Sequence, residues 1–390
     1  MVEGIIVNTD FEHLKEGIIK YYEDSCSDVN KIGIEIEFFC VESETGYPIS
    51  FIGERSISTI FDLLVRKFGY VFCSEEKYEL KRNDEYISLE PGGQIEYSGP
   101  ACYSEFVCFK KVKRFFNEIY KVIDEIGGLK LIHQGFLSNN SSKGKILIQK
   151  ERYSILADYL VKKEKLALQM MNSTASLHIN SDYFSEPHAM KAFAVTQSAS
   201  TIVASLFPNS INNCNNKYEM YRKHIWNNTD SERCGLLYDL MVPDRKFIDY
   251  IEKIIKIPLI YIYKDNRWLK VSEGITFEEY MKYGFKEYKA NLSDYLTHLN
   301  SIYHEVRIKK YIEIRSIDAQ PPERLHEPII FWRKVLSTND IMDEILEVLS
   351  YASASDFKLL HESIALLGVN AKLGSKKVSE ILNEIIRIVN

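Results

Sequence analysis

The sequence predicts an α+β fold with a largely antiparallel sheet and helices on its outside. Four stretches alternate apolar and polar residues with a period of two, which is typical of strands with one buried face. Longer stretches repeat apolar residues at helical spacing. Strands and helices do not follow a regular βαβ rhythm, so the pattern favours an antiparallel sheet over a parallel one.

The first two strand-like stretches carry acids on their polar faces. Residues 32–39 place aliphatic side chains on one face and Glu35 and Glu37 on the other. Residues 88–98 predict a hairpin that turns at PGG, with Glu90, Gln94 and Glu96 on its polar side. Its two glycines, at 92 and 93, would permit a tight turn or the close approach of a substrate.

The other two stretches add a histidine and several cations. Residues 174–180 place His178 and Asn180 opposite an aliphatic face. Residues 306–315 predict one strand, again with an aliphatic face. The polar face of that strand carries Arg307, Lys309, Glu313 and Arg315.

Helices are expected between and after these strands. Residues 104–126 have helical spacing and stop at two glycines, and residues 152–171 and 186–206 are also expected to be helical. After Pro321 and Pro322 the chain is predicted to be helical to its end, with a break near Gly374. No repeat or long linker divides the chain. We therefore expect a catalytic domain over residues 1–330 and a helical segment over residues 331–390 packed on it.

Bulk composition narrows the range of partners. The 390 residues carry a formal net charge of −6, which does not favour binding to nucleic acid or to anionic membranes. No run of apolar residues is long enough for a membrane-spanning helix. The seven scattered cysteines and the absence of a signal-like N-terminus predict a cytoplasmic protein that acts on small molecules. The oligomeric state stays open.

The acids on the polar faces indicate a cation site. A solvent-exposed face explains any one of these strands taken alone, because antiparallel sheets often leave one side wet. Acids two residues apart on a strand repel each other, however, and several such strands together suggest a counter-cation. Oxygen ligands suit Mg²⁺, with Mn²⁺ as the alternative. Arg315 beside Glu313 would supply the cation that phosphoryl transfer needs, although a simple ion pair is the other reading.

Five motifs in order resemble the plant-type and proteobacterial glutamate–cysteine ligase family. They are IGIEIEFF, SLEPGGQIEYSGP, MNSTASLHIN, YRKHIWNNTDSERCG and HEVRIKKYIEIRSID, and they span about residues 32–318. The resemblance implies a catalytic domain like that of glutamine synthetase, with a curved antiparallel sheet around a metal-lined cavity. It also implies that ATP activates a carboxylate, by default the γ-carboxylate of glutamate, as an acyl phosphate. An amine, by default cysteine, then displaces phosphate.

The resemblance also implies roles for individual residues. Glu313 and Arg315 would be catalytic, and Arg222, Trp226 and Arg233 would bind the amino acid together with Gln94. Arg307, Lys309 and Asn180 would bind the nucleotide. The metal ligands implied in this way are Glu35, Glu37, Glu90, Glu96, His178 and Glu313.

Two departures from the family pattern leave questions open. His178 stands where plant-type sequences usually have an uncharged polar residue, whereas glutamine synthetase has a histidine there, so it is either a metal or phosphate contact or a structural histidine. Residues 207–217 lack the expected glycine-rich continuation, which leaves the acceptor amine open. Cys214 and Cys234 flank the substrate segment, but nothing indicates that either is reactive. The alternatives are a ligase for another amine or acid, a phosphotransferase and an inactive nucleotide-binding scaffold.

Overall fold

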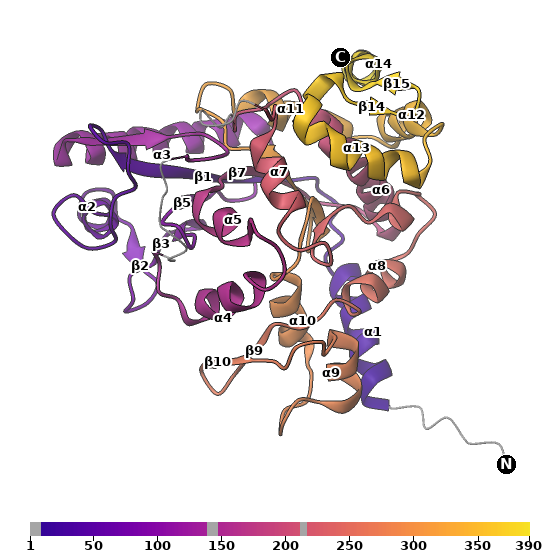
Figure 1. The fold of residues 1–390 in the computed structure, drawn as a ribbon, viewed down its shortest axis with the longest axis horizontal. Helices are drawn as coiled ribbons and strands as arrows, with labels where there is room; N and C mark the ends of the chain where they lie inside the picture. The colour runs from indigo at the N-terminus through magenta and orange to yellow at the C-terminus, as the bar shows by residue number, and fades with distance from the viewer. Residues whose placement is uncertain (1–8, 139–146, 211–216) are drawn as a thin grey trace.

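The computed structural model describes residues 9–138, 147–210 and 217–390, and it has one large sheet with helices around it (Figure 1). Nine strands form this sheet among the described residues, in the order β12-β13-β7-β1-β5-β4-β3-β2, with β6 paired to the far part of β1. Every strand pair in it is antiparallel, which confirms the predicted α+β class. Its strands are β1 (Ile32–Glu42), β2 (Val71–Phe72), β3 (Glu79–Arg82), β4 (Glu85–Leu89), β5 (Ile95–Ser98), β6 (Leu129–Ile132), β7 (Ser176–Ser181), β12 (Val306–Ile308) and β13 (Ile312–Asp318).

Three further two-stranded sheets lie outside the large one. Two are hairpins and one is a short parallel pair. They are β9 (Tyr261–Lys264) with β10 (Arg267–Lys270), β8 (Cys234–Gly235) with β11 (Tyr303–His304), and β14 (Lys372–Leu373) with β15 (Lys376–Lys377).

The helices largely follow the predicted periodicity. The predicted helix over residues 104–126 is α3, which begins after the capping side chain of Ser104 and ends at Gly127. The stretch expected to be a single helix over residues 152–171 is instead two helices, α4 and α5, separated by residues 161–166. The helices are α1 (Thr9–Glu23), α2 (Ile57–Phe68), α3 (Glu105–Ile126), α4 (Glu151–Leu160), α5 (Ala167–Ser173), α6 (Glu186–Ala204), α7 (Tyr221–Asn227), α8 (Phe247–Ile254), α9 (Phe277–Tyr283), α10 (Leu292–Leu299), α11 (His326–Val335), α12 (Asn339–Leu349), α13 (Ala354–Leu367), α14 (Val378–Val389) and the short 3-10 turns Tyr238–Leu240 and Gly368–Asn370.

The stretch predicted as one strand over residues 306–315 is a tight hairpin of β12 and β13. The chain reverses at residues 309–311, so Arg307 and Glu313 are direct neighbours across the two strands. The alternation survives the reversal because the turn keeps the parity of the residues on each side. The pairing of β13 with β7 shifts register between Ile314 and Ile317, which is the mark of a β-bulge.

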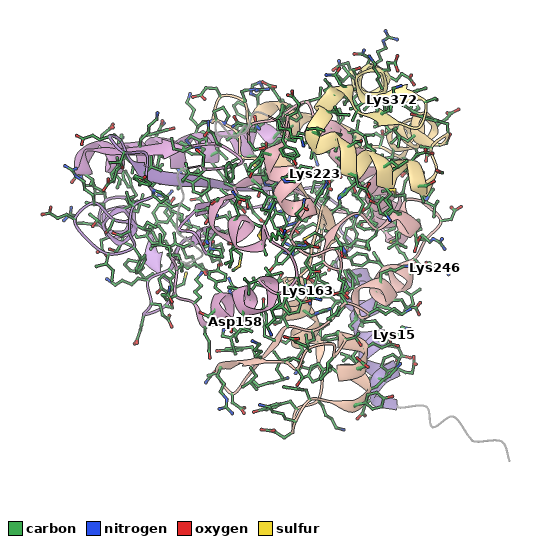
Figure 2. All side chains as sticks on the ribbon, viewed as in Figure 1. Lys15, Asp158, Lys163, Lys223, Lys246 and Lys372 are labelled. Atoms are coloured by element: carbon green, nitrogen blue, oxygen red, sulfur yellow. The ribbon has the colours of Figure 1, made fainter. Side chains whose placement is uncertain are left out.

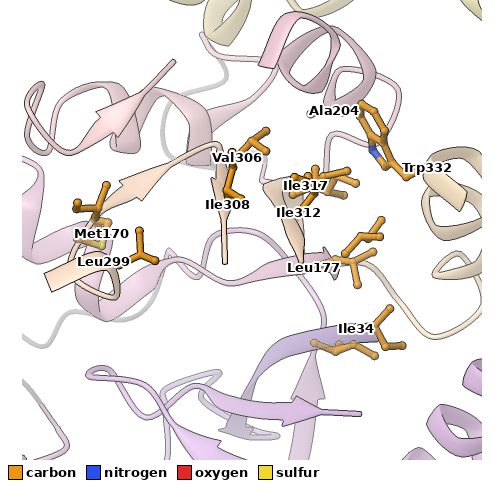
Figure 3. Close-up of a cluster of buried hydrophobic side chains, with 14 of the residues drawn as sticks. Ile34, Met170, Leu177, Ala204, Leu299, Val306, Ile308, Ile312, Ile317 and Trp332 are labelled. Carbon is orange, nitrogen blue, oxygen red and sulfur yellow. The ribbon is translucent and has the colours of Figure 1, made fainter. Parts of the chain in front are cut away.

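The aliphatic face of the sheet lies in the main hydrophobic core. Ile34 of β1, Leu177 of β7 and Ile317 of β13 extend from neighbouring strands beside Trp332 of α11 (Figure 3). These four side chains are almost completely buried. Because side chains alternate along a strand, burying this face leaves the polar residues of the same strands on the opposite side.

The C-terminal residues fold back onto the catalytic elements. Helices α12 and α14 contact α6, and α13 contacts α7, as the yellow part of the ribbon shows (Figure 1). The break expected near Gly374 is the turn of the β14–β15 hairpin, where Gly374 has a φ of +54°. The division at residue 330 stays a prediction. No helix in the described parts of the chain is long and apolar enough to cross a membrane.

Candidate active site

The polar faces of five strands surround one cavity of about 240 Å³. Pairing explains how residues distant in sequence meet there. Strand β1 runs between β5 and β7, so Glu35 lies opposite His178 and Glu37 lies opposite Glu96. The lining consists of Glu35, Glu37, Glu90, Pro91, Gln94, Glu96, Arg152, Tyr153, Leu156, Met170, Met171, Thr174, Ser176, His178, Trp226, Tyr261, Asn300, Tyr303, Arg307, Lys309, Glu313 and Arg315.

Glu35, His178 and Glu313 form a group that could hold a metal ion, with one ligand atom from each within 4.8 Å of the others. Burial and the Arg315 charge lower the pKa of His178 to about 4, so its imidazole is neutral. Its Nδ1 lies 2.7 Å from a Glu35 oxygen and therefore carries the proton. Nε2 then presents a lone pair, as a ligand nitrogen requires, and in the structure this nitrogen lies 2.8 Å from the Ser176 hydroxyl.

Glu35 itself is held as a carboxylate. Burial alone would raise the pKa of Glu35, but the hydrogen bond and the electrostatic interaction with His178, together with the Lys309 charge, outweigh it and bring the pKa down to about 2. Asn180 donates a second hydrogen bond to Glu35 at 2.9 Å. Asn180 is not part of the cavity lining, so its position supports orienting Glu35 more than contacting a nucleotide.

Glu37, Glu90 and Glu96 form an acidic group on the other side of β1. Burial and Glu90 raise the pKa of Glu37 to about 7, and burial with Glu35 raises that of Glu96 well above its usual range. No lysine or arginine among the described residues forms an ion pair with any of these three side chains. A bound cation would remove their repulsion, so the donor set fits the divalent ion that the sequence predicts.

Three cations gather on Glu313. Arg307 donates a buried hydrogen bond to Oε2 of Glu313, and an Arg315 nitrogen lies 3.5 Å from the same oxygen. The Lys309 ammonium lies 3.3 Å from the other oxygen, Oε1. These charges outweigh burial and hold the pKa of Glu313 well below its usual range. Arg307 also donates to the carbonyls of Leu299 at 3.2 Å and Ile302 at 2.8 Å. Those bonds give Arg307 a structural use in addition to the predicted contact with nucleotide.

Arg222 does not line the cavity, which corrects its predicted position. Its guanidinium is buried and donates to the main-chain carbonyls of Arg315 at 3.1 Å and Ser316 at 3.3 Å. Those carbonyls lie in the bulge of β13, where the register with β7 is shifted. Arg222 therefore holds the main chain at Arg315, on the side away from the cavity, and is not placed to bind a substrate carboxylate.

Arg233 is also outside the cavity lining and is 0% exposed. It donates to the Pro258 carbonyl and to Ser301, and its Nε lies 3.3 Å from Asp230. With protein acceptors on these nitrogens, its position does not fit the predicted contact with the donor carboxylate. Neighbouring Cys234 has its pKa raised to about 12 by burial and Asp230, which disfavours a reactive thiolate, and Cys214 lies outside the described residues.

Gln94 lines the cavity, but its amide holds the protein together. Its oxygen accepts from the Gly92 N–H at 2.9 Å, and its nitrogen donates to the carbonyls of Met171 and Thr174 at 3.1 and 2.8 Å. Gly92 is needed for the same contact, since a Cβ there would lie 2.2 Å from the main-chain oxygen of Asn172. The close approach expected for a substrate is thus made by the end of α5.

Trp226 lines the cavity as predicted, and several neighbours were not foreseen. Its buried indole N–H has no hydrogen-bond partner in the structure, so a ligand could accept from it. Arg152 enters from α4, and no carboxylate among the described residues forms an ion pair with it. Tyr261 and Tyr303 add aromatic walls. These three residues come from α4, β9 and β11, which are far apart in the sequence, so no local sequence pattern marks them.

Comparison with known proteins finds relatives over nearly the whole chain. Residues 31–387 match the family model described as glutamate-cysteine ligase family 2. The chloroplastic glutamate–cysteine ligase of Nicotiana tabacum is 26% identical over 383 residues, which cover 96% of this chain and 72% of that protein. Chloroplastic glutamate–cysteine ligase A of Oryza sativa subsp. japonica is 27% identical over 383 residues, which cover 96% of this chain and 77% of that protein.

A solved structure shows a similar fold. The glutamate–cysteine ligase of Francisella tularensis in complex with AMP superposes with a TM-score of 0.51 at 11% identity, over 93% of this chain and 78% of that chain. The plant relatives also correct one prediction, because their names place them in the chloroplast. The predicted cytoplasmic location is contradicted by this finding. Scattered cysteines are found in proteins of several reducing compartments, so they do not single out the cytosol.

Proposed function

Because the chain belongs to glutamate–cysteine ligase family 2, we propose that it joins the γ-carboxylate of glutamate to the amine of cysteine at the expense of ATP. It is thus an ATP-dependent carboxylate–amine ligase. The observation that carries the proposal is the cavity in which four acids on strands, together with Glu90 of the β4–β5 turn, face Lys309 and Arg315. A site that binds a triphosphate and transfers one phosphoryl group needs both kinds of charge.

We assign Mg²⁺, with Mn²⁺ as the alternative, as the metal of this site. Two groups of side chains would hold it: Glu35, His178 and Glu313 form one, and Glu37, Glu90 and Glu96 form the other. When bound, such ions neutralise the triphosphate and the charge that develops on the transferred phosphoryl group. The other roles belong to side chains of this protein. Lys309 and Arg315, which are 23% and 13% exposed, line the cavity, and the N–H groups that they do not direct at Glu313 would contact phosphate oxygens.

The reaction proceeds in two steps. An oxygen of the γ-carboxylate attacks the γ-phosphorus of ATP, the bond to the bridging oxygen breaks, and ADP leaves an acyl phosphate behind. The amine nitrogen then attacks the acyl carbon, inorganic phosphate departs, and the nitrogen loses a proton. Arg315 would meet the moving phosphoryl group in the first step and the leaving phosphate in the second. The aromatic walls from Tyr261 and Tyr303 would limit access of water to the acyl phosphate.

The α-carboxylate of an amino-acid substrate would bind at Arg152. This guanidinium is the cavity cation that lacks an acidic partner among the described residues, and arginine can hold a carboxylate through two parallel hydrogen bonds. The unpartnered indole N–H of Trp226 would donate to the same substrate. These assignments replace Arg222 and Arg233, which lie outside the cavity lining and whose terminal nitrogens donate to groups of the protein.

The test is phosphate release from ATP and Mg²⁺ with glutamate and a panel of amines, together with mass spectrometry of the products. Release that depends on cysteine and yields γ-glutamylcysteine supports the proposal. Release that needs another amine or acid would keep the mechanism and replace the substrate. Tight binding of ATP without phosphate release from any pair would refute the proposed activity.

A further inference from the structure

A cluster of charged and polar side chains lies outside the cavity. It joins α7, α13 and Glu305, the residue before β12. Lys223 of α7 forms an ion pair with Glu305, and His361 Nδ1 of α13 lies 3.0 Å from the Lys223 ammonium. Thr201 of α6 donates to the second oxygen of Glu305. Lys223 is labelled on α7 in Figure 2, and its side chain is only 8% exposed.

The imidazole of His361 completes this cluster as an acceptor. Burial, together with the Lys223 charge, lowers the pKa of His361 to about 2, so its ring is neutral and can accept a hydrogen bond from the ammonium group. Buried ion pairs are costly unless their remaining donors are satisfied. His361 Nδ1 also lies 3.3 Å from the Glu305 oxygen that Lys223 binds, so His361 packs against both members of the pair.

The cluster connects to Arg315 through the main chain. The carbonyl of Glu305 accepts a hydrogen bond from the Arg315 N–H at 2.9 Å. On the other side, Arg222 donates to the Arg315 carbonyl at 3.1 Å. Arg222 and Lys223 are adjacent on α7, so the Lys223–Glu305 pair fixes the two groups that hold the Arg315 peptide relative to each other.

The bulge makes these two contacts important. On one side of Arg315, the bond from its N–H to the Glu305 carbonyl continues the β12–β13 pairing. On the other side, the register between β13 and β7 shifts between Ile314 and Ile317, and Arg222 binds the carbonyls of Arg315 and Ser316. The direction of the Arg315 side chain thus depends on α7 and on Glu305. Bulges next to active sites commonly re-aim a side chain in this way.

Helix α13 is bonded to both ends of α7. The Met220 N–H, just before α7, donates to the Ala365 carbonyl at 3.0 Å, and the Asn227 side chain at its end donates to the His361 carbonyl at 2.7 Å. The C-terminal segment therefore holds α7 at the points from which Arg222 and Lys223 extend.

We propose that His361 is a positioning residue for Arg315, and that through it the C-terminal segment sets the orientation of the cation that meets the transferred phosphoryl group. This inference rests on the proposed function of Arg315. It gives the helical segment after residue 330 a role in the reaction, although none of its residues lines the cavity among those described.

The test is a double-mutant cycle with His361→Phe, Arg315→Met and the double variant, in the full-length protein. We expect His361→Phe to lower kcat for phosphate release by about tenfold, with the KM for the amino acids unchanged, and to have an effect under about twofold when Arg315 is already methionine. His361→Gln, whose amide oxygen can also accept from Lys223, should restore most of kcat. His188→Phe is the control, because His188 of α6 is also largely inaccessible to solvent and lies outside this cluster.

Equal fold losses in both backgrounds, or a loss of the same size in His188→Phe, would overturn the proposal, since either result shows a general effect on folding. An unchanged kcat in His361→Phe would also overturn it. If His361→Phe does not fold, His361→Leu at lower temperature, which removes the acceptor nitrogen, and His361→Gln give the same comparison. If the wild-type protein releases no phosphate, the proposed function fails. The same double-mutant cycle is then measured on the Kd for Mg²⁺-ATP, and an absence of coupling between His361→Phe and Arg315→Met refutes the positioning role independently.

Discussion

Replacing Arg307 by methionine separates a structural role from direct contact with nucleotide. In the structure, the Arg307 guanidinium binds Glu313 and donates to the carbonyls of Leu299 and Ile302. All of these groups are buried. Methionine has similar length but no donor, so the substitution leaves a buried carboxylate and two carbonyls without their partner.

The expected size of the effect follows from those contacts. Breaking a buried ion pair from one side costs about 3–5 kcal/mol, because the other charge stays buried. Glu313 keeps Lys309 at 3.3 Å and Arg315 at 3.5 Å, which places the ion-pair part near the lower end. The loss of donors to two carbonyls adds to it. We expect Arg307→Met to lower the free energy of unfolding by about 3–5 kcal/mol in total. With about 2.1 cal/mol/K of unfolding entropy for each of 390 residues, this loss corresponds to a Tm lower by about 4–6 °C.

The assay is thermal unfolding followed by steady-state kinetics at a temperature where the variant stays folded. Lys309→Met is the matched control, because Lys309 contacts the same carboxylate but is 23% exposed, so its loss should move Tm by less than about 1 °C. A change in Tm as small as that of the control, together with a large rise in the KM for ATP, would show that Arg307 acts on the nucleotide and would refute the structural reading.

Three further predictions concern the acids and the hairpin. Glu35→Gln should lower phosphate release by at least about 100-fold in a folded protein, because it removes one charge from the metal group, and near-normal activity would contradict that assignment. The pKa of Glu37 is raised to about 7, so Mg²⁺ must displace a proton from it at pH 6 but much less often at pH 8. Calorimetry should therefore show that the affinity for Mg²⁺ rises, and that the number of protons released on binding falls, from pH 6 to pH 8. No change in either quantity would argue against Glu37 as a ligand. Gly92→Ala should lower stability by about 1–3 kcal/mol through the clash with the main chain of α5, and reduce turnover by shifting Glu90, whereas Gly17→Ala in α1, with nothing within 4 Å of the added carbon, should not destabilise; equal stability of the two variants would refute the close packing of Gly92.

Local alternation allowed the sequence to predict which side chains share a face. Because side chains alternate along any strand, an aliphatic set at residues 32, 34 and 36 forces Glu35 and Glu37 to the other side whatever the strand pairs with. The same argument held for β7 and for the Gly-Gly hairpin. It also survived an error at residues 306–315, since the turn between β12 and β13 keeps parity and leaves Lys309, Glu313 and Arg315 facing the same cavity.

The roles of the arginines could not be derived in this way. Arg222 and Arg233 have the chemistry to bind a carboxylate, and nothing in a linear pattern shows that their terminal nitrogens donate to main-chain carbonyls of distant segments. Arg152 was missed for the converse reason, because it is an ordinary charged residue of a helix until the fold places it at the cavity without an acidic partner.

The sequence by itself therefore determined the class of fold, the acidic faces and the family, since each depends on residue order and on the period of a strand. The tertiary structure alone decided which strands are neighbours, that β12 and β13 form a hairpin, and that α7 and α13 support the bulge at Arg315. Those features arise from contacts between residues far apart in the chain. Whether a buried charge is free for a substrate or already paired depends on which acceptors such contacts place within hydrogen-bonding distance.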